Sequence, residues 1–380
     1  MRIAVTGATG LVGYQVARAA VEAGHEVVAP VRAGSTAHHG LTTLSATGRL
    51  ERRRADLATA SRMVEALEGC DALVHCAAVY AYGADRSAEV ESVNVEGTRS
   101  VLEAAAAAGV ARAVVTSSSV TCGSRSVPAA CTEADAPHLE PSPAYYASKV
   151  AQEHAATEVA GRTGLEVVLA LPTVVLGGPY GRLGPSNAIV LRHLLDPTRS
   201  TFAGGCNVVD ARDVGSGHLC LLERGTPGER YLLGGEDVTW RELHGHVARL
   251  AGLPGPFLET PAATAQWAAG LAEAWARLTG GRPLVTTDEA ATVGRYYWYS
   301  SARAAGLGYT ARPVGEAVAA SIAWLLAGDD LPRWVREALR VDPAVRSARR
   351  LIPRPLQDPP PAQRVRPPRP RRPRRPTHPR

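Results

Sequence analysis

The glycine-rich turn near the amino terminus places the strongest constraint on how this chain can fold. Residues 6–13, Thr-Gly-Ala-Thr-Gly-Leu-Val-Gly, follow a short apolar segment at 2–5 and precede a segment whose apolar residues recur at helical spacing. A strand that turns directly into a helix presents backbone N–H groups at the positive helix end, where a diphosphate binds. Gly7 permits the tight turn, Gly10 lets the backbone approach the ligand, and Gly13 lets the helix lie close to the sheet. A glycine triplet alone is often only a turn, but in this context it predicts a dinucleotide site. The residues predicted to line that site are Gly7, Thr9, Gly10, Leu11, Val12 and Gly13.

The order of the segments predicts an α/β fold, a doubly wound parallel sheet with a smaller, mainly helical part that covers a substrate. Aromatic residues make up only 5% of the chain, which suits aliphatic parallel strands covered by Ala-rich helices. We assign residues 1–177 to the sheet, with 205–235 returning to it. Residues 178–204 and 236–330 are assigned to the substrate-binding part.

Amphipathic patterns predict three helices in that second part, over residues 240–250, 262–278 and 314–326. Tryptophans in such helices are usually core residues. We therefore expect Trp267 and Trp275 to be buried and to contribute to an apolar pocket.

The carboxyl-terminal segment has a composition of its own. Beyond a body that ends near Gly328, residues 331–352 are expected to form a basic helix and residues 353–380 a disordered Pro/Arg tail. The tail holds nine Arg against Asp358 alone, a charge of +8, so the chain's net +6 leaves −2 on the remaining residues. The basic pI therefore says nothing about the folded body. Arg-rich tails can contact nucleic acid or anionic membranes, but a solvated appendage is the simpler interpretation, and no specific nucleic-acid partner is expected.

Cysteine usage and the amino terminus predict the compartment. Six scattered cysteines form no C-x-x-C pair and no metal-binding spacing, so we expect reduced core thiols and no metal. The chain opens on a strand, which leaves no room for a signal peptide, and no apolar run is long enough to span a bilayer. We expect a soluble cytoplasmic protein.

The second strand, over residues 26–32, favours NADP over NAD. In a dinucleotide fold an acidic residue there accepts hydrogen bonds from a free ribose 2′-hydroxyl. Here the strand ends in Arg32, with Ser35 nearby and no carboxylate, and an Arg can pair with a 2′-phosphate. The alternative is that Arg32 is only a surface residue of an Arg-rich chain, in which case NAD remains a candidate.

Two later segments carry unusual residues. The strand over 72–76 runs into Ala77-Ala78, and small residues there would let the adenosine half of a cofactor lie against the backbone. A helix predicted over 88–108 contains Asn94 and Gly97, which both weaken a helix interior. They indicate either a tolerated kink or an amide that joins a hydrogen-bond relay.

Hydroxyl groups and a lysine predict a catalytic set. The strand over 113–118 ends in Ser117-Ser118-Ser119, at the edge of a parallel sheet where ligands bind. Tyr145 and Lys149 are four residues apart, hence on one face of a helix. Lys149 is also the only lysine in the chain. An ordinary surface lysine would tolerate replacement by Arg, whereas a compact ammonium beside a phenol would not.

This ordered set of motifs resembles an extended short-chain dehydrogenase/reductase of the NAD-dependent epimerase/dehydratase family, over roughly residues 1–327. The likeness is greatest to dihydroflavonol 4-reductase-like and hopanoid-associated sugar epimerase-like members. It rests on the motifs already described and on residues 75–78, 94–98, 204–210 and 231–235. The resemblance implies a Rossmann fold and bound NAD(P).

The resemblance also implies roles for individual residues. Tyr145 would exchange a proton with the substrate oxygen, Lys149 would lower its pKa and hold the nicotinamide ribose, and Ser118 would bind the substrate oxygen. Ser117 and Ser119 are alternatives to Ser118, and Tyr146 could replace Tyr145 only by breaking the spacing to Lys149. The remaining implied roles are a water relay for Asn94, adenine contacts for Asp56 and Leu57, and a place beside the nicotinamide for Pro172 and Thr173.

One departure bears on the reaction. Sugar-nucleotide members of this family usually carry an Arg-Asp pair entering the strand that here reads Cys206-Asn207-Val208-Val209. The leading hypothesis is therefore an NADP-preferring oxidoreductase acting on a secondary alcohol or ketone. A sugar epimerase or dehydratase with retained NAD(P) is the alternative among enzymes, and a cofactor-binding redox sensor the alternative among regulators. The expected partner is a small-molecule substrate, and a homodimer is one expectation because this family often dimerises through two helices.

Overall fold

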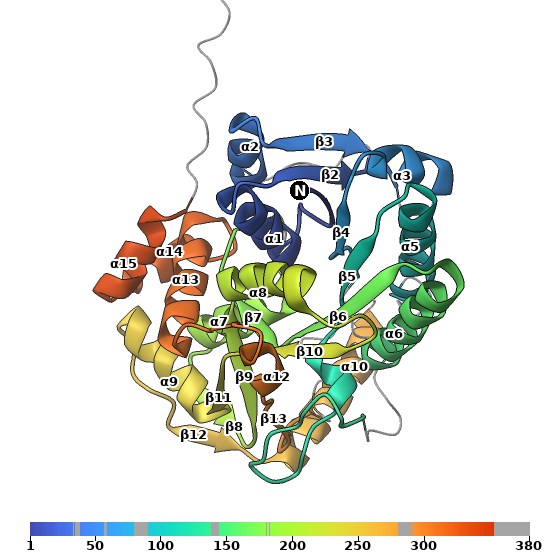
Figure 1. Cartoon of the computed structure of the whole chain (residues 1–380). Coiled ribbons are helices and arrows are strands. Elements are labelled where there is room, and N and C mark those ends of the chain that lie inside the picture. Colours follow the sequence, from blue (N-terminus) through green and yellow to red (C-terminus); the bar gives the residue numbers. More distant parts are fainter. Residues whose placement is uncertain are drawn as a thin grey trace, which may run out of the picture.

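A seven-stranded parallel sheet forms the centre of the fold (Figure 1). Its strand order is β3-β2-β1-β4-β5-β6-β10, and every pairing is parallel. The order reverses between β1 and β4, where the carboxyl ends of the strands form a crevice. The strands are β1 (Arg2–Thr6), β2 (Glu26–Val31), β3 (Leu50–Arg54), β4 (Ala72–His75), β5 (Arg112–Thr116), β6 (Glu166–Pro172) and β10 (Arg230–Leu233). The computed structural model describes residues 1–32, 34, 39–56, 59–79, 90–137, 144–179, 181, 183–279, 290 and 292–352.

Helices cover both faces of this sheet, which confirms the doubly wound α/β fold. Alternate residues of β1 point to opposite faces: Ile3 and Val5 pack in one apolar cluster and Ala4 in the other. Helices α1 (Leu11–Glu22), α2 (His39–Ala46) and α8 (Ala211–Arg224) cover the first face. Helices α3 (Ala60–Leu67), α5 (Gly97–Ala107) and α6 (Ala144–Thr163) cover the second. Helix α2 was not predicted from the sequence, because the polar composition of its segment is typical of a loop.

The second part of the molecule contains more strand than expected. A four-stranded sheet joins β7 (Val174–Leu176), β9 (Gly205–Asp210), β11 (Glu236–Thr239) and β13 (Tyr296–Tyr297), and β8 (Ser200–Phe202) pairs with β12 (Leu258–Thr260). The expectation that residues 205–235 all return to the main sheet is wrong, because β10 joins that sheet whereas β9 pairs with β7, β11 and β13. An apolar pattern identifies a buried strand but not its neighbours.

Helices α7 (Pro185–Leu195), α9 (Trp240–Ala251), α10 (Ala262–Thr279), α12 (Ala302–Ala305) and α13 (Val314–Ala327) complete this part. The expected burial of Trp267 and Trp275 on α10 is wrong: their exposed fractions are 77% and 69%. The small residues Ala269 and Ala276 are buried instead. An apolar helix can face the body with its alanines, so hydrophobicity alone did not identify the buried face.

The body continues past Gly328, so the expected boundary there and the single basic helix are wrong. Two short helices, α14 (Arg333–Ala338) and α15 (Pro343–Arg350), follow α13. Val335 and Val345 are buried in the same apolar cluster as α13. The predicted tail, residues 353–380, lies outside the described residues. In the part of the chain that is described, no helix has the length and apolarity needed to cross a membrane.

Candidate cofactor and catalytic site

The glycine turn has the close contacts that a dinucleotide site requires. Gly7 has a φ of +69°, and a Cβ there would lie 2.7 Å from the backbone N of Ala77. Gly10 donates its N–H to the Gly7 carbonyl at 2.8 Å. A Cβ at Gly13 would overlap that same carbonyl, so any side chain would push α1 off the turn. Only glycine at the positions of Gly7 and Gly13 therefore allows this turn and the close approach of α1 to it.

The start of α1 fits an anion. Its N-cap is Gly10, no described side chain caps it, and its first turn holds no acidic residue. The first N–H groups of the helix, from Leu11 and Val12 onward, thus have no side-chain partner and lie at the positive end of the helix dipole. Thr9 lies in the turn itself. These residues fit the diphosphate of a dinucleotide, as predicted from the sequence.

Charged residues gather where the adenosine half of a dinucleotide would lie. Arg32 follows β2 directly and is exposed, and Asp56 is exposed just beyond the end of β3. Arg54, the last residue of β3, is exposed and pairs in register with Val31. The sequence analysis missed Arg54, although a strand that ends in three consecutive arginines shortly before Asp56 was a usable signal. Leu57 lies outside the described residues.

The other predicted cofactor residues lie along the same edge of the sheet. Ala77 and Ala78 follow β4, and the Ala77 N–H approaches Thr6 Oγ1 at 3.4 Å. Pro172 ends β6, and Thr173 donates its hydroxyl to Asn207 Oδ1 at 2.8 Å. The strand ends therefore bring these residues to the edge that also carries the glycine turn.

Tyr145 and Lys149 lie one turn apart on α6, and Lys149 Nζ is 5.9 Å from the centroid of the Tyr145 ring. The Tyr145 hydroxyl shares a hydrogen bond with the Ser118 side chain. Ser119 is instead bonded to Tyr299. Among the candidate serines, Ser118 is thus the one placed against the phenol.

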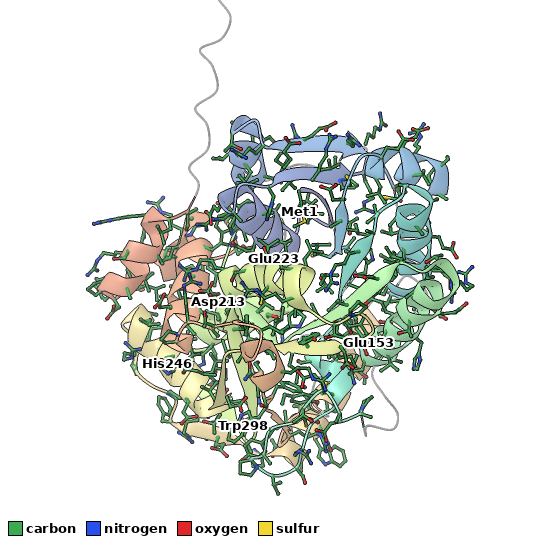
Figure 2. The ribbon with its side chains drawn as sticks, in the orientation of Figure 1. Met1, Glu153, Asp213, Glu223, His246 and Trp298 are labelled. Atoms are coloured by element: carbon green, nitrogen blue, oxygen red, sulfur yellow. The ribbon has the colours of Figure 1, made fainter. Side chains whose placement is uncertain are left out.

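The third serine belongs to a separate polar group. Ser117 donates its hydroxyl to Glu153, which lies on α6 beside the strand ends (Figure 2). Glu153 also forms an ion pair with Arg230 of β10, at 3.1 Å. Ser117 therefore ties β5 to α6 and β10, and its hydroxyl does not point at Tyr145.

Burial perturbs both members of the Tyr145/Lys149 pair. Burial lowers the pKa of Lys149 to about 8, an effect that the carboxylate of Glu153 partly opposes. Burial likewise raises the pKa of Tyr145 well above its ordinary value, while the hydrogen bond from Ser118 acts in the opposite direction. A phenol in such surroundings needs a neighbouring positive charge to exchange a proton near neutral pH.

The hydrogen bonds of Asn94 account for the presence of a residue that weakens a helix interior. A π-helical turn, Ser92–Glu96, precedes α5, and such turns often mark functional sites. The Asn94 amide is fully buried; it accepts from the Val79 N–H at 2.8 Å and donates to the Val79 carbonyl at 2.9 Å and to Ser148 Oγ at 3.2 Å. It thus anchors the segment after β4 to α6. Its part in a water relay stays a prediction.

Lys149 has a partner that the sequence analysis missed. Its Nζ donates to the Thr116 carbonyl at 3.1 Å and to Gln152 Oε1 at 2.8 Å. Gln152 is three residues from Lys149 and therefore on the same side of α6. That spacing, together with a polar side chain in a buried helix, was a usable signal.

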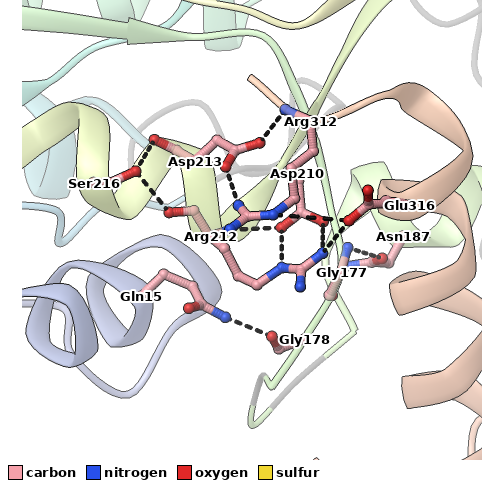
Figure 3. Close-up of polar contacts among 10 residues, drawn as sticks. All are labelled: Gln15, Gly177, Gly178, Asn187, Asp210, Arg212, Asp213, Ser216, Arg312 and Glu316. Carbon is pink, nitrogen blue, oxygen red and sulfur yellow. Dashed lines mark hydrogen bonds and ion pairs between the residues drawn. The ribbon is translucent and has the colours of Figure 1, made fainter. Parts of the chain in front are cut away.

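Polar contacts gather around the ends of β7 and β9 (Figure 3). Gln15 of α1 donates its amide to the Gly178 carbonyl, beyond β7, at 2.6 Å. Asp210 at the end of β9 is 1% exposed and caps α8 by accepting the Arg212 N–H at 2.8 Å. It also accepts from the Arg212 guanidinium at 2.9 and 2.7 Å. The Gln15 bond holds the segment after β7 against α1, and the Asp210 bonds hold the end of β9 to the start of α8.

Comparisons with known proteins agree with this arrangement. The family described as "NAD dependent epimerase/dehydratase family" matches residues 3–234. A protein of Synechocystis sp. named "Putative dihydroflavonol 4-reductase" is 31% identical over 331 residues, which cover 84% of this chain and 93% of that protein. "Sterol demethylase protein B" of Methylococcus capsulatus is 34% identical over 267 residues, covering 69% of this chain and 78% of that protein.

A solved structure gives the same result. A nucleoside-diphosphate-sugar epimerase from Pseudomonas aeruginosa is 27% identical, with a TM-score of 0.68, and the match covers 87% of this chain and 99% of that one. The matched family region contains the glycine turn, the π-helical turn, and the Ser118, Tyr145 and Lys149 positions. The chain belongs to the NAD dependent epimerase/dehydratase family, a family of NAD-dependent oxidoreductases, epimerases and dehydratases.

Proposed function

We propose that this protein is an NADP-preferring oxidoreductase that interconverts a ketone and a secondary alcohol. The observation that carries the proposal is the contact set of Ser118, Tyr145 and Lys149 at the same sheet edge as the glycine turn. When bound, the nicotinamide supplies or accepts the hydride. Tyr145 gives its hydroxyl proton to the carbonyl oxygen as the carbon is reduced, and takes it back in the oxidation.

The other two residues support that proton transfer. Ser118 orients the substrate oxygen by a hydrogen bond beside the Tyr145 hydroxyl. The Lys149 ammonium stabilises the tyrosinate left behind, which offsets the rise in pKa that burial imposes on the phenol. Its remaining N–H is available to a ribose hydroxyl of the cofactor.

The preference for NADP rests on two arginines. Arg32 and Arg54 lie at the neighbouring ends of β2 and β3, where the adenosine ribose of a dinucleotide lies in this fold. A 2′-phosphate can accept charge-assisted hydrogen bonds from both guanidinium groups. A free 2′-hydroxyl offers no charge for them to pair with.

The substrate assignment rests on β9. The segment Cys206-Asn207-Val208-Val209 is buried and lacks the Arg-Asp pair of sugar-nucleotide members. Two relatives whose printed names refer to dihydroflavonol and sterol substrates also favour an uncharged carbonyl compound. The similarity to a nucleoside-diphosphate-sugar epimerase keeps an epimerase or dehydratase as the second candidate.

The two candidates differ in their use of cofactor. A reductase consumes NADPH continuously, whereas an epimerase returns the hydride to its substrate and shows no net consumption. We expect purified protein to oxidise NADPH steadily with a bulky apolar ketone from a panel, and to leave nucleotide sugars unchanged by chromatography. Lys149→Arg and Tyr145→Phe should lose that turnover while retaining the fold. Interconversion of a nucleotide sugar with no net NADPH oxidation would replace this proposal by the second candidate.

We also propose a cytoplasmic location and a small-molecule substrate as the main partner. The six cysteines are all free thiols, which suits a reducing compartment. Pairing of two copies through helices, as is common in this family, is a further expectation that sedimentation of the full chain would measure.

A further inference from the structure

A buried chain of hydrogen bonds runs from Lys149 to the strand that ends in the glycine turn. Lys149 Nζ donates to Gln152 Oε1 at 2.8 Å, and Gln152 Nε2 donates to Thr98 Oγ1 at 2.8 Å. His75 Nε2 lies 3.0 Å from Thr98 Oγ1, and His75 Nδ1 lies 2.7 Å from Thr6 Oγ1. All five side chains are buried, and they belong to α6, α5, β4 and β1. Thr6 directly precedes Gly7.

The donor and the acceptor of each of these hydrogen bonds follow from the chemistry of the groups that take part. Thr98 donates its one hydroxyl proton to the Asn94 carbonyl at 2.7 Å, so it can only accept from Gln152 and His75. Burial lowers the pKa of His75 to about 3, so the ring is neutral and carries its proton on Nε2. An ammonium has donors only, so Gln152 must turn its oxygen toward Lys149 and its NH₂ toward Thr98.

We propose that Gln152 is a positioning residue for Lys149: its side-chain oxygen, oriented by Thr98, holds the ammonium against the Thr116 carbonyl. Two of the three Nζ protons are then taken by acceptors that the structure describes, which leaves one N–H for a ligand. The inference rests on the proposed function only in one respect, namely that Lys149 takes part in catalysis. The position of Nζ is a property of the folded chain.

This row of hydrogen bonds holds the Lys149 ammonium in place but does not conduct protons away from it. To pass a proton on, the Gln152 amide would have to give up an N–H proton to Thr98. The Thr98 hydroxyl would then have to release its own proton to a backbone carbonyl of Asn94, which does not carry it further. Protons therefore do not leave Lys149 through Gln152 and Thr98.

Several charged or titratable groups surround Lys149, and their effects can be separated. Burial is the largest influence and lowers its pKa to about 8, while Glu153 on α6 and Cys76 beyond β4 raise it. His75 on β4 is neutral, and the phenol of Tyr145 is protonated because burial raises its pKa. A hydrogen bond to the charged form favours that form, so the Gln152 oxygen keeps the pKa of Lys149 from falling further.

Lys149 can be observed directly because the chain contains no other lysine. The full-length protein, labelled with lysine carrying ¹³C at Cε, should give one lysine side-chain signal whose shift against pH reports its pKa. Gln152→Met has nearly the same shape but no acceptor, and should lower the pKa of Lys149 by about half a unit or more. Gln152→Glu places a carboxylate beside Nζ and should raise it by about one unit or more.

A second buried glutamine supplies the control. Gln15 on α1 is as well buried as Gln152 and also uses its amide in a hydrogen bond, to the Gly178 carbonyl. Gln15→Met should leave the titration of Lys149 unchanged. Thr98→Val releases the Gln152 amide and should lower the pKa of Lys149 in the same direction as Gln152→Met.

Opposite shifts in Gln152→Met and Gln152→Glu are the expected result. Unchanged titration in both variants, or shifts of the same sign, would overturn the inference. If Gln152→Met does not fold, the comparison of Gln152→Glu with the wild-type protein still decides the question. The measurement needs no substrate and no cofactor. If the protein had no reductase activity, the proposed function would fail but the inference about Gln152 would stand. If the protein were an active reductase and the pKa of Lys149 did not change in the Gln152 variants, the inference about Gln152 alone would fail.

Discussion

The amine of Lys149 should make the folded protein gain stability as the pH rises above neutrality. Burial places the pKa of Lys149 at about 8 in the folded chain, against an ordinary value of 10.5 that applies when the chain is unfolded and the amine is solvated. Between these two values the unfolded state binds more protons than the folded state, so the free energy of unfolding rises with pH. Integrated over this range, the gain between about pH 7 and pH 10 is on the order of 2–3 kcal/mol.

The assay is urea unfolding of the wild-type protein and of Lys149→Met at several pH values over that range. Tyrosines and cysteines that do not interact with Lys149 titrate alike in both proteins, so their contributions cancel in the difference between the two free energies of unfolding. Burial raises the pKa of Tyr145 and of Cys76, so both groups stay protonated in the folded protein over this pH range. From neutral to alkaline pH, we expect the free energy of unfolding of the wild-type protein to rise by about 2–3 kcal/mol relative to that of Lys149→Met. A difference that stays constant, or that moves toward Lys149→Met, would show that the amine of Lys149 is solvated in the folded chain.

Four further variants test the site. Tyr145→Phe should lower turnover by about a hundredfold or more while leaving the Kd for NADPH within a few-fold, measured by stopped assays and fluorescence titration. Arg32→Asp and Arg54→Ala should each weaken NADPH binding by about tenfold or more, with a much smaller effect on NADH; equal losses for both cofactors would remove that arginine from 2′-phosphate recognition. Gly13→Ala should overpack the contact with the turn, cost about 1–3 kcal/mol and weaken NADPH binding. The matched change Gly161→Ala, which meets open space on α6, should leave both quantities nearly unaltered or improve the stability.

Local chemistry in the sequence was enough to predict the core of the fold. Gly7 and Gly13 are required by a positive φ and by a close approach of backbones, and these constraints are visible in the residue types themselves. Helical and strand periodicity placed the parallel strands and most of their helices within a few residues. The spacing of Tyr145 and Lys149 predicted one helix face because that geometry depends only on the helical repeat.

Which surfaces meet depends on contacts between elements that are distant in sequence. Strand β9 was recognised as a buried strand, but its pairing with β7, β11 and β13 depends on partners distant in sequence. Trp267 and Trp275 were assigned to the core because they are apolar, yet α10 buries its alanines. Helix α15 packs onto α13, and α14 contributes Val335 to the same apolar cluster, although the basic composition of this segment suggested separation from the body. Burial follows from complementarity between elements, which composition does not encode.

The same division runs through the site. From the residue types and their order we predicted that a glycine turn, three serines, a tyrosine and a single lysine would gather at the carboxyl edge of a parallel sheet. Only the folded chain decided that Ser118 meets the phenol, since Ser117 and Ser119 are bound to Glu153 and Tyr299. Only the fold likewise connects Lys149 through Gln152 to β1, because those hydrogen bonds join four elements whose relative positions are determined by packing and not by any local pattern.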